Sequence, residues 1–271
     1  QAPPSWVKED VHAYAAMKWK INDAYEAIED LVDSYQGAGA TADQLDRLAQ
    51  TGPGIHVKHD IVDQLTGEVR FVTAAGESGG YGGDQILIAL GVQNDQSAGD
   101  VLSKIADETG METRDFRGAT VYEVNGSGAG QAVGLTISDG RLLVCIGGTL
   151  LDQVLRNDSD MKPLAESEEY RKVAQHFPAD ALSVQFSRPA EQYRSMYEMV
   201  RSGTAAEQFP GSQEIFEKID FTTLPPFETV AKYIHATGGY SVKDDNGVFM
   251  EAFQLMRLKY RSTEILTQLV K

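Results

Sequence analysis

Three side chains with metal-binding chemistry lie close together early in the sequence: His56, His59 and Asp60. Imidazole nitrogens and carboxylate oxygens are ligands of zinc and similar ions. Residues three or four apart share one face of a helix. His56 follows Gly54 closely, however, where a helix has not yet begun. The pattern therefore allows a metal site or a polar helix start in which Asp60 favours the helix dipole, and it favours the helix start.

A second group with ligand chemistry is the run Asp244, Asp245 and Asn246, which is followed by Gly247. Residues 157–160 have a similar composition. A helical calcium loop needs ligands at alternate positions and a glutamate at the twelfth, and neither segment supplies the whole set. Because Asn and Gly tolerate positive φ, the first run is better explained as a hairpin turn. A weak surface calcium site is the alternative, and we expect no other cofactor.

Catalytic chemistry has little support in the sequence. There is no Gly-x-Ser-x-Gly elbow, and the one cysteine, Cys145, lies in an apolar run without a charged neighbour, which is typical of a small buried hydrophobe. Glycines 126, 128 and 130 superficially resemble a phosphate-binding loop, but the residues after them alternate like a strand instead of opening a helix. We therefore expect no catalytic or cofactor-binding residues and no enzyme activity.

Strands joined by tight turns dominate the expected elements. Residues 132–137 and 142–146 flank Asp139-Gly140, a strong two-residue hairpin signal, and residues 240–242 and 248–253 flank the turn at 244–247. The near-continuous apolar run Ile86–Val92 predicts a central strand. Hairpins imply antiparallel pairing. With amphipathic helices between the strands, the sequence predicts an α+β fold of antiparallel sheets with helices packed on one face.

A strand followed by an amphipathic helix occurs twice, at residues 11–32 and 181–200. The apolar positions of the two helices keep a constant offset, with Tyr25 matched by Tyr193 and Ile28 by Met196. We therefore expect an internal duplication of a strand-helix-helix-hairpin unit. The expected organisation is a first α+β unit (1–95), a central helix and hairpin segment (96–178), a second α+β unit (179–258) and a helical tail (259–271).

The charge balance excludes some partners as first hypotheses. The chain has 40 acidic and 24 basic residues among 271, for a net charge of -16. Such a surface repels phosphate backbones and anionic lipid at long range. No stretch approaches the roughly 18 apolar residues of a membrane-spanning helix. We therefore expect neither nucleic acid as a partner nor a transmembrane segment.

Several short segments together resemble a family of predicted exported bacterial proteins that carry a domain of unknown function. The resembling segments are Pro4-Ser5-Trp6-Val7 with Asp10-Val11, Ala24-Tyr25-Glu26-Ala27-Ile28, Leu31-Val32, Asp60-Ile61, Leu65-Thr66-Gly67, Thr149-Leu150, Val154-Leu155 and Leu224-Pro225-Pro226-Phe227. The resemblance implies an extracytoplasmic bacterial protein, periplasmic or at the cell surface. It also implies a fragment or processed form, because members tend to be longer, and it supplies no catalytic residues.

These observations lead to one functional expectation and one rival. We expect a non-enzymatic, extracytoplasmic structural or protein-interaction module that binds a protein partner or associates with itself. The rival is a carrier of lipid or another hydrophobic ligand, held between a curved antiparallel sheet and the helices across its mouth. Adaptable methionines such as Met196 and Met250 would suit such a cavity, although they equally suit a packed core.

Overall fold

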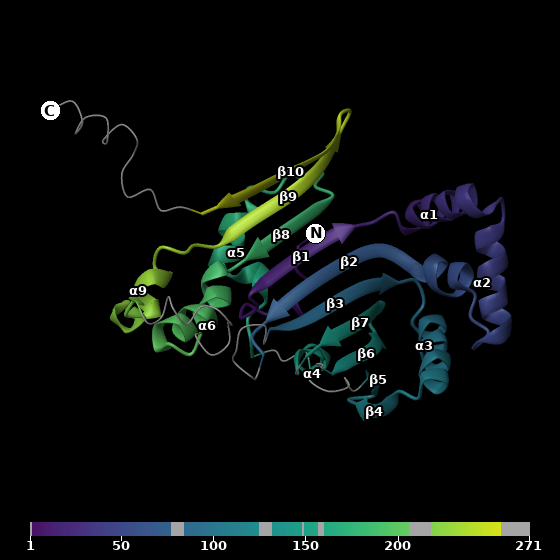
Figure 1. The fold of residues 1–271 in the computed structure, drawn as a ribbon, viewed down its shortest axis with the longest axis horizontal. Coiled ribbons are helices and arrows are strands. Elements are labelled where there is room, and N and C mark those ends of the chain that lie inside the picture. The colour runs from purple at the N-terminus through teal and green to yellow at the C-terminus, as the bar shows by residue number, and fades with distance from the viewer. Residues whose placement is uncertain are drawn as a thin grey trace.

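One ten-stranded antiparallel sheet forms the centre of the protein in a computed structural model (Figure 1). The structure describes residues 2–76, 84–124, 132–147, 149–156, 160–205 and 218–255. The strand order across the sheet is β10-β9-β8-β1-β2-β3-β7-β6-β5-β4. The strands are β1 (Ala13–Lys18), β2 (Leu65–Ala74), β3 (Gln85–Val92), β4 (Glu112–Phe116), β5 (Ala119–Val124), β6 (Val133–Ser138), β7 (Arg141–Ile146), β8 (Ser183–Ser187), β9 (Thr237–Asp244) and β10 (Gly247–Gln254).

Helices connect the strands at their ends and across the sheet. They are α1 (Ile21–Gln36), α2 (Ala40–Thr51), α3 (Asp95–Thr109), α4 (Leu150–Arg156), α5 (Glu168–Ala174), α6 (Pro189–Ser202) and α9 (Phe227–Ala231), with a π-helix at Val57–Ile61 and 3-10 turns at Val62–Gln64, Leu164–Glu166 and Phe221–Thr223. None of the described helices is long and apolar enough to span a bilayer. The predicted tail at 259–271 lies outside the described residues.

The chain traces a similar course at the two places where the sequence pattern repeats. β1 leads through α1 and α2 to β2, which pairs with β1 and continues to β3. β8 leads through α6 and α9 to β9, which pairs with β8 and continues to β10. β1 and β8 lie side by side and antiparallel, so α1–α2 and α6–α9 project from opposite ends of the strands (Figure 1). The predicted antiparallel α+β fold is confirmed, whereas duplication and the four-part division stay predictions.

Turn chemistry sets the hairpins. Asp139 and Gly140 have φ values of 51° and 72° and join β6 to β7, as predicted from the sequence. Arg117 and Gly118 likewise have positive φ and join β4 to β5, a hairpin whose first strand begins at Glu112. Two successive residues with positive φ match the right-handed twist of antiparallel strands.

The hydrophobic core lies on one face of the sheet, the core face. Its strand residues include Val72, Leu87, Leu143 and Phe186, each at most 2% exposed. Helices α4 and α5 cover this face together with the N-terminal segment at residues 6–11. The predicted covering of one face needs one correction. Helix α3 packs on the opposite face, where its residues meet Ile137 and Leu142, because neighbouring residues of a strand such as Leu142 and Leu143 point to opposite sides.

Candidate functional site

The second face of the sheet, which we call the open face, carries no charged side chain over most of its width. The strand registers bring its members into line across β10 to β5. Its apolar half consists of Phe71, Ile86, Ile88, Leu90, Val144, Ile146, Val133, Leu135, Tyr122 and Val124. Its uncharged polar half consists of Ser183, Gln185, Ser187, Thr237, Gly239 and Ser241, and Ala13, Ala15 and Met17 of β1 lie between the halves.

Side chains of the apolar half are half-buried or exposed in the described structure, whereas those of the core face are enclosed. In β3, Ile86 is 37% exposed while its neighbour Leu87 is 0% exposed. An antiparallel sheet face that meets water usually alternates with polar and charged residues. Large aliphatic side chains without charges on an open surface are typical of a contact with another apolar surface.

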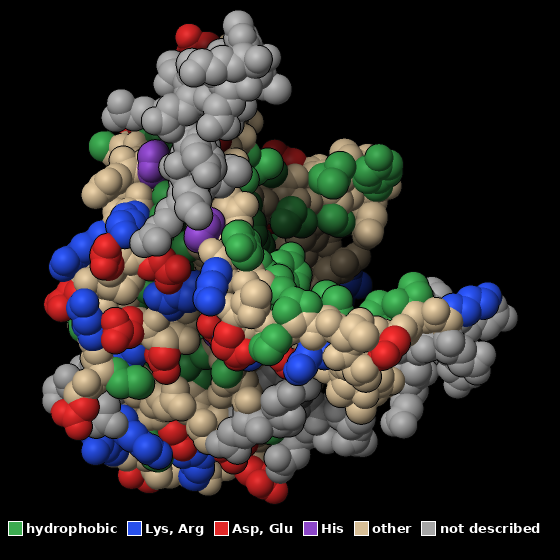
Figure 2. All heavy atoms as spheres, turned by 90° about the vertical axis from the view of Figure 1, so that its left-hand side faces the viewer, with side chains coloured by type: hydrophobic (Ala, Val, Ile, Leu, Met, Phe, Trp, Pro, Cys, Tyr) green, Lys and Arg blue, Asp and Glu red, His purple; other side chains and the backbone are tan. Residues whose placement is uncertain are grey.

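Two helical arms border the open face. Figure 2 shows hydrophobic side chains gathered in a hollow, between a near projection formed by α6 and α9 and a far one formed by α1. Helix α1 has no buried residue, and its Ile28, Leu31 and Tyr35 are all exposed. In the second arm Tyr193 and Met196 of α6 are exposed as well. Both arms that border the open face therefore carry exposed apolar side chains.

Asp33 joins the two helices of the first arm. Its carboxylate accepts hydrogen bonds from the backbone of Thr41 at 2.9 Å, from the Thr41 hydroxyl at 2.8 Å and from the backbone of Gly39 at 2.6 Å. The bonds from Thr41, followed by that from Gly39, lower the pKa of Asp33. The carboxylate thus satisfies backbone donors at the start of α2, although it comes from the preceding helix.

This geometry predicts that acid loosens the start of α2. Because the folded pKa of Asp33 lies below its unfolded value, the stabilising contribution is present above the unfolded pKa and is lost as pH falls through the folded pKa. We expect the amide protection factors of Gly39 and Thr41 to fall between about pH 5 and about pH 2. Asp33→Ala should lower them already at pH 5, whereas Asp30→Ala on the same helix should not. Equal protection in both variants at pH 5 would contradict this assignment.

The predicted metal-binding residues near the π-helix point to different partners. Nδ1 of His56 lies 3.7 Å from a carboxylate oxygen of Asp46, and Nδ1 of His59 lies 3.3 Å from one of Asp63. Asp60 accepts a hydrogen bond from the backbone of His56 at 2.8 Å. His56 is extended and precedes the π-helix, so the expected sharing of one helical face does not arise. Within the described ranges, no three His, Cys, Asp or Glu side chains are arranged to hold a metal ion.

The second candidate group forms the turn between β9 and β10. The backbone N–H of Asn246 donates to a carboxylate oxygen of Asp244 at 2.7 Å, while Gly247 has a φ of 135° and pairs with Asp244 in the sheet. Asp245 is exposed at the tip. These contacts are those of a turn closed by a side chain. The hairpin prediction is confirmed, and a surface calcium site stays a prediction.

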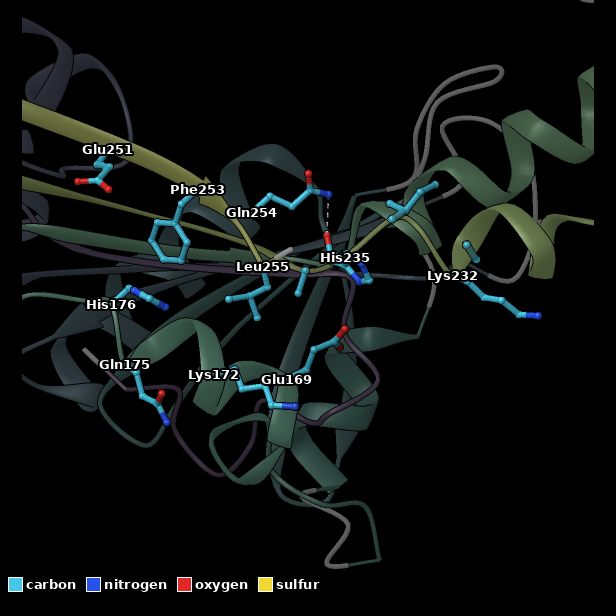
Figure 3. Close-up of a pocket in the computed structure, with 13 residues that line it drawn as sticks. Glu169, Lys172, Gln175, His176, Lys232, His235, Glu251, Phe253, Gln254 and Leu255 are labelled. Carbon is cyan, nitrogen blue, oxygen red and sulfur yellow. Dashed lines mark hydrogen bonds between the residues drawn. The ribbon is translucent and has the colours of Figure 1, made fainter. Parts of the chain in front are cut away.

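A cavity of about 1020 Å³ that the sequence did not suggest lies between α5, the segment before β9, and the end of β10 (Figure 3). Its lining residues are far apart in the sequence, which is why no local pattern marks it. The His176 ring lies against Phe253 with centroids 4.9 Å apart. Several of its charged groups are already paired: Glu169 with Arg188 and Lys172 with Glu168, each at 2.6 Å. The cavity is therefore lined partly by apolar groups, and two of its charged side chains are neutralised by ion pairs with neighbouring residues.

Cys145 is buried on the core face, as the sequence predicted. Burial raises the pKa of its thiol, because desolvation disfavours the thiolate. Since the thiolate is the reactive form, this cysteine is poorly suited to act as a nucleophile.

No protein-family model matches the chain, and no curated protein matches it. Among solved structures the chain is similar to two crystal forms of TP0453, at 11% sequence identity in both. For form I the TM-score is 0.44, with 98% of this chain and 83% of that chain covered. For form III the TM-score is 0.42, with 99% and 86% covered.

Proposed function

We propose that this protein is a non-enzymatic, extracytoplasmic interaction module that binds an apolar surface of a protein partner on its open face. The observation that carries the proposal is the uncharged, half-buried apolar half of that face, centred on Ile88 and Val144. The chain as a whole has a net charge of -16, but this half of the open face carries no charged side chain. It therefore fits a partner surface that is neutral or apolar. The extracytoplasmic location rests on the family resemblance of the sequence.

The energetics favour such a contact. Taking an Ile or Leu side chain from full exposure to burial contributes about 1.5 to 3 kcal/mol. Side chains such as Ile88 and Leu135 are already half-buried, so a partner gains roughly 1 kcal/mol from each. Summed over the apolar half, this gain offsets the cost of association if the partner has a complementary shape. The two arms border the face and would restrict the orientation of the partner.

The internal duplication belongs to the same proposal. Two related units that meet where β1 pairs antiparallel with β8 would place one arm at each end of the open face. A stacked pair of such units builds a surface more readily than a catalytic centre. In the cavity at α5, Glu169 is paired with Arg188 and Lys172 with Glu168, which also supports a role in binding over one in catalysis.

A second candidate function is the carriage of a hydrophobic ligand. It is favoured by the two apolar arms, between which a ligand could lie on the sheet. The apolar pocket between α3 and the sheet has a volume of about 100 Å³, whereas cavities that enclose a drug-sized ligand measure roughly 300 to 1,000 Å³. The cavity of about 1020 Å³ at α5 is large enough, but charged side chains such as Lys172, Lys232 and Glu251 line it beside its apolar groups. The protein-partner proposal therefore fits the geometry better, because the uncharged apolar surface lies on the open face.

Site-specific photo-crosslinking tests the proposal. A photoreactive residue in place of Ile88, in cells that produce the protein, should give one discrete protein adduct. The same residue in place of Lys162, which is exposed near Leu164 on the core-face side, should not. Adding Val144→Lys to the Ile88 variant should abolish the adduct, because a partner cannot bury that charge.

Native mass spectrometry of gently purified protein separates the two candidates. A carrier brings ligand mass with it and gives no protein adduct at residue 88. A protein that shows neither ligand mass nor a difference between positions 88 and 162 would overturn both functions.

A further inference from the structure

The two edges of the sheet differ in how well they are protected against pairing with another strand. An edge strand presents a row of unpaired backbone N–H and C=O groups, which natural proteins shield with charges, proline, bulges or short strands. β4 and β10 are the two edge strands. Their sequences and exposures predict opposite behaviour.

The β4 edge is protected. β4 has five residues, among them the charged Glu112, Arg114 and Asp115. Arg114 is held by Glu123 and by Asp152, at 2.6 Å each. A strand added here would have to desolvate these groups, which is costly.

The β10 edge has only one of these protective features, a single charged residue. It is eight residues long and keeps an unbroken register with β9, from Gly247 opposite Asp244 to Gln254 opposite Thr237. Three consecutive large apolar residues are exposed, Val248 by 62%, Phe249 by 52% and Met250 by 77%. Its one charged residue, Glu251, accepts a hydrogen bond of 2.6 Å from the Tyr240 hydroxyl. In the described part of the chain, β10 pairs with β9 alone.

We propose that β10 pairs antiparallel with the β10 of a second copy of this chain, so that one sheet runs through a two-fold dimer. An extended strand is the partner that can satisfy a row of backbone donors and acceptors. A two-fold axis uses the same edge on both copies, and each copy then supplies the apolar side chains that the other needs. Because β4 resists pairing, association stops at two copies and does not continue into a filament. Val248 and Met250 lie on the open face, because Met250 pairs with Ser241, so the dimer extends that face at its β10 end. It leaves the apolar half centred on Ile88 and Val144 uncovered, so it does not require the function proposed above.

Charge gives the dimer a distinctive salt dependence. Each copy has a net charge of -16, and Asp244 and Asp245 lie at the hairpin tip near the proposed interface. The copies therefore repel one another at long range, while the pairing itself is made by backbone groups and apolar side chains. Salt screens this repulsion, so the dimer tightens as salt rises, whereas an interface held by opposite charges weakens.

Sedimentation equilibrium of the full chain over a range of concentrations tests the dimer. We expect a monomer–dimer equilibrium that shifts to dimer when the salt concentration rises from about 50 mM to about 500 mM. Met250→Lys should raise the dissociation constant about tenfold or more. Thr113→Lys, the same charge change at an exposed position on the β4 edge, should leave it unchanged. A monomer at every concentration, or equal effects of the two substitutions, would overturn the proposal.

Cysteine crosslinking supplies a second, geometric test. Cys145 is the one cysteine of the chain, so single cysteines can be placed along residues 248–252 in a Cys145→Ser background. When two identical strands pair antiparallel about a two-fold axis, a residue lies opposite its own copy only where the axis passes between the strands. We therefore expect disulfide-linked dimer to peak at one position and to fall on both sides of it. Uniform crosslinking along the strand, or crosslinking only through a cysteine at Thr113, would contradict the β10 interface.

Discussion

Replacing Leu87 with alanine is expected to lower the free energy of unfolding by about 3 kcal/mol. Leu87 is 0% exposed and belongs to the core cluster between the sheet, α4 and α5. The substitution removes buried methyl groups and leaves a cavity that the close-packed surroundings fill only in part. Urea denaturation followed by circular dichroism measures the loss.

The matched control is the adjacent, isomeric side chain. Ile86 points to the open face and is 37% exposed, so Ile86→Ala should cost only about 1 to 2 kcal/mol. The two substitutions remove the same number of carbon atoms one residue apart and differ in which face loses them. If both substitutions lowered the free energy of unfolding equally, the open face would be as well enclosed as the core face. That result would contradict the proposed function, which requires an accessible open face.

Replacing Gly67 with alanine is expected to cost a similar amount, about 3 kcal/mol, for a different reason. Gly67 has a φ of 83°, and a Cβ atom placed on it would lie 2.1 Å from the backbone oxygen of Trp19. The backbone N–H of Trp19 also donates to the carbonyl of Gly67 at 2.7 Å. A methyl group at this position must therefore separate two segments of backbone and break the contact that fixes the start of the first arm.

A second glycine isolates the steric part of this effect. Gly110 has a φ of 68°, but nothing lies within 4 Å of a Cβ atom placed on it. Gly110→Ala should therefore show only the cost of the left-handed backbone, about 1 kcal/mol. Thermal and urea unfolding of both variants measure the difference. If both glycine substitutions cost the same, the close approach of Trp19 has no energetic weight.

The contrast between the two faces links the stability predictions to function. The core face supplies the packing that keeps the sheet in one conformation, through residues such as Leu87 and Phe186. The open face contributes less to folding, and under the proposed function its apolar area binds the partner. Substitutions on the open face should therefore impair binding before they unfold the protein.

Much of the local structure could be predicted from the sequence. Asp139-Gly140 defined the β6–β7 hairpin because few residue pairs accept positive φ twice in succession. The run Asp244 to Gly247 predicted the β9–β10 turn because Asp, Asn and Gly are typical turn residues, and Gly247 has positive φ there. The apolar setting of Cys145 predicted its burial. Antiparallel pairing and the α+β class followed from such hairpins.

The candidate site could not be predicted in the same way. His56 and His59 have ligand-like spacing, but His56 lies before the π-helix, and the two side chains face different carboxylates. The cavity at α5 joins His176 to Phe253 and other residues from distant segments, so no local pattern marks it.

The sequence by itself determined the hairpins, the helices with their apolar stripes and the antiparallel class, because these depend on φ preferences and on periodicity along the chain. Tertiary structure alone decided that Leu87 is enclosed while Ile86 and Ile88 line an open face. The physical reason is that β3 is apolar on both sides. Periodicity shows which of its residues share a face, whereas the covering of a face depends on which distant segments return to pack on it.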